Sequence, residues 1–339
     1  MLGVVIGAFS VSAIVLRPWV GREVDRRGRK LFTALGIGLS AVSCLAYSFT
    51  DGLAGLIAVR LLHGSAIACF YTAASAFAAD LAPESRRGEA ISYFSTVLYA
   101  GSAIGPLIGE FLVAEGGFLL AFRTAALIGL LGFGLSLILD EPPRERLPRE
   151  KSPLLHRGVT FPALVLMLAA PCWAALSFVP LYLEGSVGAS GLFFLALSIT
   201  VLGVRPLLGR VSDRLSRGTI ILPGIALTGL SMAALALGAS RPAVISAAIL
   251  FGVGWGALWP GLLSLSIDLV PESQRGSATG TFTAAFDLSF GLGSALLGFM
   301  LESGGFEVLF AAAGLGALAS FVVFLSGKGR IAVSPAEAA

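Results

Sequence analysis

Long apolar segments constrain this chain more than any other feature of its sequence. Hydrophobic residues make up 56% and charged residues 13% of its 339 residues, a balance typical of membrane proteins. A helix needs about 20 apolar residues to cross about 30 Å of hydrocarbon. Because the candidate segments are rich in Ala, Leu and Gly and lack apolar-polar alternation, we predict an all-α integral membrane protein. Eleven segments qualify: 1–20, 32–49, 54–79, 90–113, 117–139, 160–183, 187–208, 219–238, 242–267, 277–301 and 304–326.

Positive charges indicate how these segments are oriented. Strict alternation places five further regions on the same side of the membrane as residues 21–30: 80–89, 140–158, 209–218, 268–276 and the tail after 326. Together with the segment ends Arg17 and Arg205, these regions hold twenty of the 23 Lys and Arg residues. Since Lys and Arg are enriched in cytoplasmic loops, we predict that this side faces the cytoplasm of a cell whose plasma or inner membrane holds the protein. The basic balance then reflects topology and indicates no nucleic-acid partner.

The same charged stretch occurs twice in the chain. Residues 17–27 read RPWVGREVDRR, and residues 205–215, 188 positions later, read RPLLGRVSDRL. At the same offset, DLAPESRRG at 80–88 returns as DLVPESQRG at 268–276. The chain is therefore interpreted as a tandem duplication. Because the offset spans six segments, an even number, we expect two parallel repeats of six helices.

The duplication also predicts the domains. They are an N-terminal helical bundle over 1–139, a cytoplasmic linker over 140–158, a C-terminal six-helix bundle over 159–326 and a cytoplasmic tail over 327–339. The linker contains prolines and mixed charges that suit a tether. Segment 160–183 has no twin, because its counterpart would precede Met1, so we expect the first helix of the first repeat to be missing. A misassigned start codon, which we favour, a truncated chain or a natural eleven-span form would each explain this.

These features resemble the major facilitator superfamily of secondary transporters over essentially the whole chain. The second cationic loop keeps part of that family's loop motif, at Gly209, Asp213, Arg214 and Arg217, but has Ser216 where the motif has Gly. RLLHG at 60–64 resembles the fourth-helix motif, with His63 in place of Gln. The first loop matches the loop motif at Gly21, Asp25, Arg26, Gly28, Arg29 and Lys30.

A further stretch, GSAIGPLIGE at 101–110, resembles the fifth-helix motif of proton-coupled exporters, and this resemblance implies antiport. Glu110 stands where that motif has a second Gly. Apart from the resemblance, glycines four residues apart share one helix face and predict tight helix packing, and the proline predicts a kink. The matching positions are Gly101, Gly105, Pro106 and Gly109.

Acidic residues recur at equivalent places in the two copies. Attraction to anionic lipid would explain the cations of the loops but does not require an Asp in both. We therefore predict a cytoplasmic gate in which Asp25 and Asp213 accept hydrogen bonds from nearby Arg side chains or helix N-termini, with Asp80 and Asp268 in the same clusters. Exposed pairs contribute under about 1 kcal/mol each, so only a network that breaks as a unit can bias two conformations.

Asp287 is the clearest buried charge. It lies about ten residues into its segment, near mid-membrane at about 1.5 Å per residue, where an ionisable group costs roughly 2.5–3.5 kcal/mol. We predict that Asp287 binds protons or a substrate cation; the alternative is a protonated carboxyl bonded to a neighbouring hydroxyl. Its helix face carries small and polar residues and must face protein or water: Gly276, Gly280, Thr283, Gly291, Ser294 and Gly298.

Four other residues inside the segments are candidates for function. Arg60 lies about six residues into its segment, some 9 Å by helical rise, where snorkelling to the interface is an alternative. His63, one turn later, is a candidate proton relay, although such a His more often packs through a hydrogen bond. Tyr71 and Trp259 are equivalent in the two copies. The resemblance places them on cavity-lining helices, and core packing is the alternative.

The sequence thus predicts a proton-coupled exporter of a small organic molecule that works by alternating access, with Asp287, Arg60 and His63 as the coupling residues. An uptake symporter of the same fold and a non-transporting remnant are the alternatives. With two histidines and no metal-ligand pair, nucleophile elbow or phosphate loop, an enzyme is not indicated, and no cofactor is expected. The cysteines lie in segments and suggest no disulfide or metal site. Partners are the substrate, protons and lipid, and the resemblance implies a monomer.

Cysteine labelling tests the predicted orientation. We expect Arg26→Cys and Arg214→Cys to react with a membrane-impermeant reagent only from the cytoplasmic side, because parallel repeats place equivalent loops on one face. Asp51→Cys, in a loop of the opposite side, serves as the control and reacts only from outside. Labelling of the two cationic loops from opposite faces would contradict the duplication.

Overall fold

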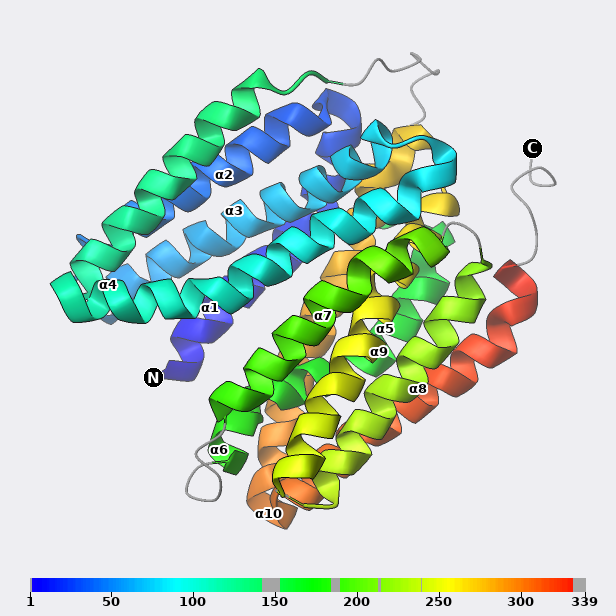
Figure 1. The fold of residues 1–339 in the computed structure, drawn as a ribbon. Helices are drawn as coiled ribbons and strands as arrows, with labels where there is room; N and C mark the ends of the chain where they lie inside the picture. The colour runs from blue at the N-terminus through cyan, green and yellow to red at the C-terminus, as the bar shows by residue number, and fades with distance from the viewer. Residues whose placement is uncertain (1, 142–152, 184–189, 213–214, 239, 332–339) are drawn as a thin grey trace. The chain divides into compact units, whose positions relative to one another are not determined.

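The computed structural model describes residues 2–141, 153–183, 190–212, 215–238 and 240–331, and its regular structure in these residues is helical (Figure 1). Short 3₁₀ turns precede or join helices at Glu84–Arg86, Arg157–Val159, Leu176–Phe178 and Glu272–Gln274. The α-helices of the described residues are α1 Leu2–Arg27, α2 Arg29–Tyr47, α3 Gly52–Leu81, α4 Arg87–Ile138, α5 Thr160–Ala175, α6 Val179–Leu183, α7 Ser190–Ser212, α8 Arg217–Ala236, α9 Arg241–Asp268 and α10 Arg275–Ile331.

Helices α4 and α10 each contain a break at glycine. In α4, Gly116 has φ −150° and ψ 19° and Gly117 has φ 69° and ψ −174°. In α10, Gly305 has φ 74° and ψ −173°. Positive φ is open to glycine because it has no Cβ. Gly117 and Gly305 lie 188 positions apart, so the two copies of the sequence break at the same place.

Seven helical stretches of the described residues are long and apolar enough to cross a membrane. α1, α7 and the first part of α4 are not among them, so the number of eleven spans stays a prediction. The seven stretches are Arg29–Tyr47, Gly52–Leu81, Phe111–Ile138, Arg157–Leu183, Arg217–Ala236, Arg241–Asp268 and Glu272–Gly327.

Contacts along the chain form two compact units, and each combines residues of both sequence copies. The first contains Met1–Leu81, Ile104–Val159 and Val270–Asp287. The second unit comprises Ala82–Ala103, Thr160–Leu269 and Leu288–Ala339.

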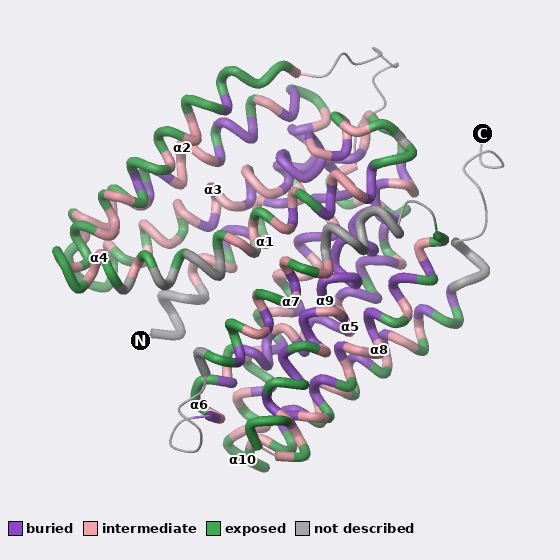
Figure 2. The backbone as a smooth tube through the Cα atoms, in the orientation of Figure 1, coloured by how far each residue is buried: buried purple, intermediate pink, exposed green. Residues whose placement is uncertain are grey.

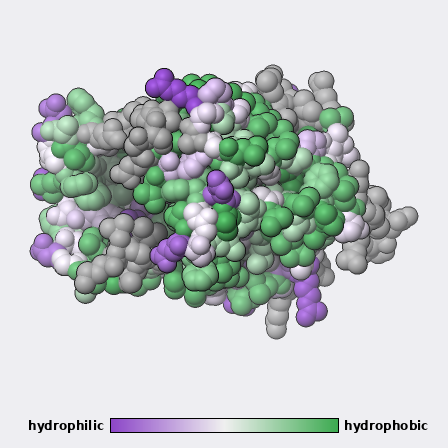
Figure 3. All heavy atoms as spheres, turned by 90° about the horizontal axis from the view of Figure 1, so that it is seen from below, coloured by the Kyte–Doolittle hydropathy of each residue, from purple (hydrophilic) through white to green (hydrophobic). Residues whose placement is uncertain are grey.

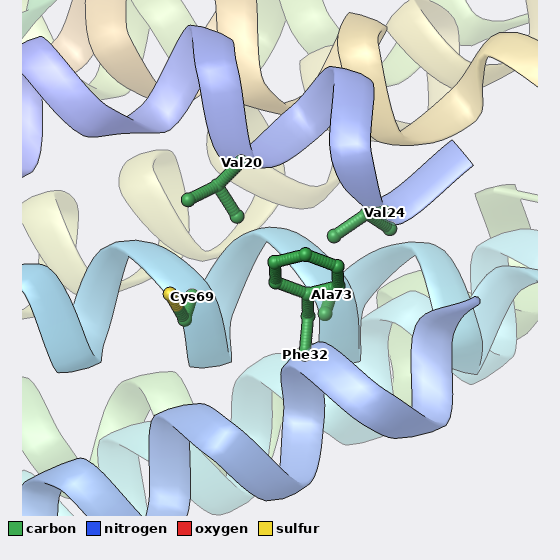
Figure 4. Close-up of a cluster of buried hydrophobic side chains, with 5 residues drawn as sticks. All are labelled: Val20, Val24, Phe32, Cys69 and Ala73. Carbon is green, nitrogen blue, oxygen red and sulfur yellow. The ribbon is translucent and has the colours of Figure 1, made fainter. Parts of the chain in front are cut away.

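The first unit is built on α3, which packs against both α1 and α2. A buried cluster marks this contact (Figure 4): Val20 and Val24 come from α1, Phe32 from α2, and Cys69 and Ala73 from α3. Packing must hold these helices together, because apolar lipid offers no hydrophobic force to drive helices towards one another. Small residues help, because they allow the helices to approach closely.

The second unit is built on α9, which packs against α7 and α8 and is buried along most of its length (Figure 2). Aromatic rings fill part of this core. The ring of Trp255 stacks on Trp173, Phe251 and Trp259 at centroid distances of 5.3, 5.7 and 6.2 Å. Aromatic side chains bury a large apolar surface when they pack in this way.

Large apolar side chains also cover the outside of the helices. Phe111, Leu135 and Ile138 are 64%, 67% and 76% exposed. Hydrophobic side chains extend over much of the face shown in Figure 3. Apolar exposure on this scale suits a surface in contact with lipid chains.

Candidate functional site

A buried ion pair joins α1 to the first part of α10. Nε of Arg17 lies 2.5 Å from Oδ2 of Asp287, and the two side chains are only 8% and 15% exposed. The Arg17 guanidinium also lies over the ring of Tyr71 on α3, with Cζ 5.7 Å from the ring centroid. The carboxylate singled out by hydropathy therefore has a cationic partner, and that partner has an aromatic ring beside it.

The sequence pattern predicts Arg17 to be a cytoplasmic charge at the end of an apolar segment. α1 instead continues to Arg27, ten residues or about 15 Å further, so Arg17 lies well inside the helix. A signal was present in the sequence: one acid and one base in apolar segments need each other, because an unpaired charge in that environment is costly.

The predicted polar stripe on α10 faces protein only in part. Gly276, Gly280 and Thr283 are buried, but Gly291 is exposed. Ser294 and Gly298 are half-buried. That this face of α10 meets protein or water rather than lipid stays a prediction.

Asp25 caps the N-terminus of α10. Its Oδ1 and Oδ2 accept hydrogen bonds from the backbone N–H groups of Gly276 and Ser277, each at 2.7 Å. The first N–H groups of a helix have no partner inside the helix and carry partial positive charge, so a carboxylate is well placed there. Gly21 makes the approach possible: a Cβ on Gly21 would overlap the backbone of Gly276.

Asp80 pairs with two arginines beside the contact between Asp25 and α10. Nε of the buried Arg29 lies 2.8 Å from Oδ2 of Asp80, and its Nη2 lies 3.4 Å from Oδ1 of Asp25. Arg29 also donates to the carbonyl oxygen of Glu272 at 2.8 Å. Arg275, at the start of α10, pairs with Asp80 and, at 2.9 Å, with the Glu272 carboxylate. Two cations thus share three carboxylates at the junction of α1, α2, α3 and α10.

Asp268 forms a matching cluster in the second unit. Nε of Arg217 lies 3.0 Å and Nη1 of Arg87 lies 3.6 Å from its carboxylate oxygens. All three residues are shifted by 188 positions from those of the Asp80 cluster, and in both clusters one arginine comes from each sequence copy. The clusters differ in burial, because the Asp268 side chain is 32% exposed and that of Asp80 13%.

Glu141 is a functional candidate that the sequence analysis did not single out. Its Oε1 and Oε2 accept hydrogen bonds from the backbone N–H groups of Arg29 and Lys30, each at 2.8 Å, and so cap α2. Gly28 makes room for this carboxylate with a φ of 120°. Glu141 follows α4, so only the folded chain brings it to the cationic loop.

Several predicted gate residues lie elsewhere or outside the described residues. Arg26 pairs with Glu23 at 3.0 Å but is 63% exposed, so this pair contributes little. Asp213 and Arg214 fall in the part of the chain that the structure does not describe. Gly209 lies on α7, where neighbouring side chains are not described.

The glycines of the fifth-helix motif do not form a tight helix contact among the described residues. A Cβ added to Gly101, Gly105 or Gly109 would meet nothing within 4 Å. Tight packing on this glycine face therefore stays a prediction. The break in α4 also falls at Gly116 and Gly117 and not at Pro106.

The remaining candidates separate into two environments. Trp259 is 8% exposed and lies in the aromatic core around α9. Arg60 and His63 lie on α3 beside Tyr47 of α2, where the Arg60 guanidinium stands over the Tyr47 ring with Cζ 5.7 Å from the centroid. Glu110 lies on α4 with a side chain that the structure does not describe. Among the described residues, no cluster of His, Cys, Asp and Glu could hold a metal ion.

Known proteins resemble this chain in sequence. The family model for the Major Facilitator Superfamily matches residues 1–265 and 173–337. The staphylopine export protein of Staphylococcus aureus is 26% identical over 339 residues, covering 93% of this chain and 84% of that protein. The quinolone resistance protein NorA of Staphylococcus aureus is 27% identical over 144 residues, covering 42% of this chain and 37% of that protein.

Solved structures show the same fold. The human organic anion transporter MFSD10 (TETRAN) matches with a TM-score of 0.79 at 18% identity, covering 95% of this chain and 83% of that one. The fucose:proton symporter FucP of E. coli also matches with a TM-score of 0.79, at 15% identity, covering 95% of this chain and 89% of that one. The resemblance seen in the sequence motifs is therefore confirmed: the chain belongs to the Major Facilitator Superfamily and is a multi-pass protein of the plasma membrane.

Proposed function

We propose that this transporter couples proton entry to the efflux of a small organic molecule by alternating access. The observation that carries the proposal is the ion pair of Arg17 and Asp287, buried between apolar helices. Two opposite charges there neutralise each other. A proton that binds Asp287 removes one of the charges and leaves Arg17 without a counter-charge, which is costly in such surroundings.

The pair is linked to the proposed gate through the same two helices. Arg17 and Asp25 lie eight residues apart on α1, about 12 Å, and Ser277 and Asp287 ten residues apart on α10, about 15 Å. Loss of the pair therefore weakens the contact between α1 and the N-terminus of α10, which Asp25 caps. Protonation of Asp287 and opening of the gate favour each other.

This link gives an exchange cycle. A proton from outside reaches Asp287, the contact between α1 and α10 loosens, and the cytoplasmic end opens. Binding of the organic molecule and release of the proton to the cytoplasm restore the charge on Asp287. The pair of Arg17 and Asp287 re-forms, the gate closes, and the molecule leaves on the other side. The two half-cycles therefore use two states of the protein, one with Asp287 protonated and one with Asp287 charged.

Two observations support efflux rather than uptake. The staphylopine export protein aligns with most of this chain, and the stretch at 101–110 resembles the motif of proton-coupled exporters. A symporter would carry proton and substrate in the same direction through the same pair, so the direction of flow separates the two functions.

The proposed architecture follows the duplication. Each of the eleven apolar segments crosses the membrane once, residues 1–139 and 159–326 form the two moving bundles, and residues 140–158 link them in the cytoplasm. The matching breaks at Gly117 and Gly305 and the matching helix starts at Arg29 and Arg217 support this division. The transporter works as a monomer, with the cationic loops facing the cytoplasm.

Substitution of Asp287 tests the coupling. In proteoliposomes with a luminal pH dye, staphylopine or a quinolone moving through the wild-type protein drives protons the opposite way. We expect Asp287→Asn to abolish this proton movement, because an amide cannot exchange a proton. Asp51→Asn, at an exposed carboxyl, leaves it unchanged. Proton movement at the wild-type ratio in Asp287→Asn would disprove the assignment.

Unfolding experiments on the same variants test the pairing. Arg17→Gln or Asp287→Asn alone lowers the free energy of unfolding by about 3–5 kcal/mol, because one buried charge loses its partner. The double variant Arg17→Gln/Asp287→Asn recovers most of this loss but not the coupling. Additive losses in the double variant would show that the two side chains do not interact.

The gate prediction concerns the first turn of α10. Asp25→Ala is expected to destabilise the protein by about 1–2 kcal/mol and to speed hydrogen exchange at Gly276 and Ser277, because their N–H groups lose the acceptor. Glu302→Ala, at an exposed acid of α10, stays within about 0.5 kcal/mol of wild type. Unchanged exchange in that turn would rule out Asp25 as its cap.

A further inference from the structure

A second group of polar side chains lies inside the first unit, apart from the ion pair. Arg60 and His63 lie on α3, and Tyr47 is the last residue of α2. Arg60 follows the start of α3 at Gly52 by eight residues, about 12 Å along the helix. We call Tyr47, Arg60 and His63 the Arg60 cluster.

Aromatic rings hold the Arg60 cluster together. The ring centroids of Tyr47 and His63 are 6.0 Å apart. Phe9 of α1 meets the edge of His63 at 5.6 Å, and Phe122 of α4 stacks on Tyr47 at 5.1 Å. With Arg60 over the Tyr47 ring, four helices contribute side chains to one small region, and the packing of their rings helps to fix its geometry.

Each member of the Arg60 cluster carries a buried polar atom without a hydrogen-bond partner. These atoms are Nε of Arg60, Nδ1 of His63 and the hydroxyl oxygen of Tyr47. Within the described residues, Arg60 also has no carboxylate within ion-pair distance. Arg17, a buried arginine on α1 of the same unit, has Asp287 as its counter-charge. Buried polar atoms are rarely left unsatisfied, so three together call for an explanation.

We propose that the Arg60 cluster binds the carboxylate of the transported molecule. All three atoms can donate: the guanidinium offers a planar fork, the tyrosine its O–H, and neutral histidine an Nδ1–H. A carboxylate only accepts, so it can satisfy all of them and neutralise Arg60 at the same time. A cationic group would be repelled by Arg60. Calling the ligand a cargo rests on the transport function proposed above.

This assignment separates two tasks between two arginines. Arg17 is already neutralised by Asp287, and that pair responds to protons. Arg60 lacks a fixed counter-charge, so an anionic substrate can provide one. The transporter therefore takes an organic acid, and the cluster sets this preference by charge and by donor geometry.

Binding of matched probes to the full chain tests the site. Benzoate, benzamide and benzylammonium have similar shapes but differ in charge, and their affinity is measured from the shift in unfolding temperature in neutral-lipid nanodiscs. We expect benzoate to bind at least about tenfold more tightly than either analogue, because a charged hydrogen bond contributes more than a neutral one. Equal affinity for benzamide or benzylammonium would overturn the proposal.

Variants assign the binding to the cluster. Arg60→Gln weakens benzoate binding by about tenfold or more and Tyr47→Phe by about threefold, whereas Arg60→Lys retains part of the affinity because it keeps the charge but not the fork. Arg123→Gln, at an exposed arginine of the same unit, has wild-type affinity. If Arg60→Gln does not fold, the difference between Arg60→Lys and Arg123→Gln decides. Wild-type affinity for benzoate in Arg60→Gln would refute the site. If only Arg60→Lys folds, wild-type affinity in that variant would refute it.

Anionic lipid could supply the same chemistry, and a further arm separates the two sources. With phosphatidylglycerol in the nanodiscs, benzoate affinity stays within twofold if the site serves a cargo. Loss of benzoate binding in these discs, restored in neutral lipid, would identify a lipid headgroup site and overturn the proposal. Asp287→Asn separates the proposed function: if benzoate still binds through Arg60 while protons move normally in Asp287→Asn, the coupling assignment fails and this site stands.

Discussion

Charge inside an apolar helix has to be neutralised by the protein itself, and the proposed coupling of this transporter depends on that constraint. Arg17 and Asp287 meet it by pairing between α1 and α10. A buried pair is a modest source of stability, but it is expensive to break by removing one charge. For this reason the packing of two helices depends on whether one carboxyl holds a proton.

The charged clusters show that the duplicated halves are not equivalent. Asp80 and Asp268 each pair with two arginines, one from each sequence copy. The Asp80 cluster is more buried, and Asp25 joins it at the start of α10. Charges in a less polar environment interact more strongly. The contact around Asp80 is therefore the firmer of the two, and it is the one that shares its helices with Arg17 and Asp287.

The helical fold could be predicted from the sequence, and Asp287 could be singled out as a charge inside an apolar segment, because both depend on local hydropathy. The duplication was read from repetition. Sequence reasoning missed the role of Arg17, since the positive-inside rule counted this residue among the cytoplasmic charges, at the end of a segment. It also expected packing at Gly101 and its neighbours but overlooked Gly21 and Gly276, where α1 and α10 do meet. A pattern of small residues shows that a helix can be approached closely. Which helix approaches is decided by the fold.

The distance between the C-terminal end of α1 and the N-terminal end of α10, measured at different pH, tests the proposed coupling most directly. Spin labels at Arg26 and Ser273 report it by electron paramagnetic resonance in a background without the native cysteines. We expect acidification to widen the separation in the otherwise unchanged protein, and the separation in Arg17→Gln/Asp287→Asn to stay the same at every pH. The same pH-dependent widening in that double variant, or no widening in either protein, would contradict the proposed coupling.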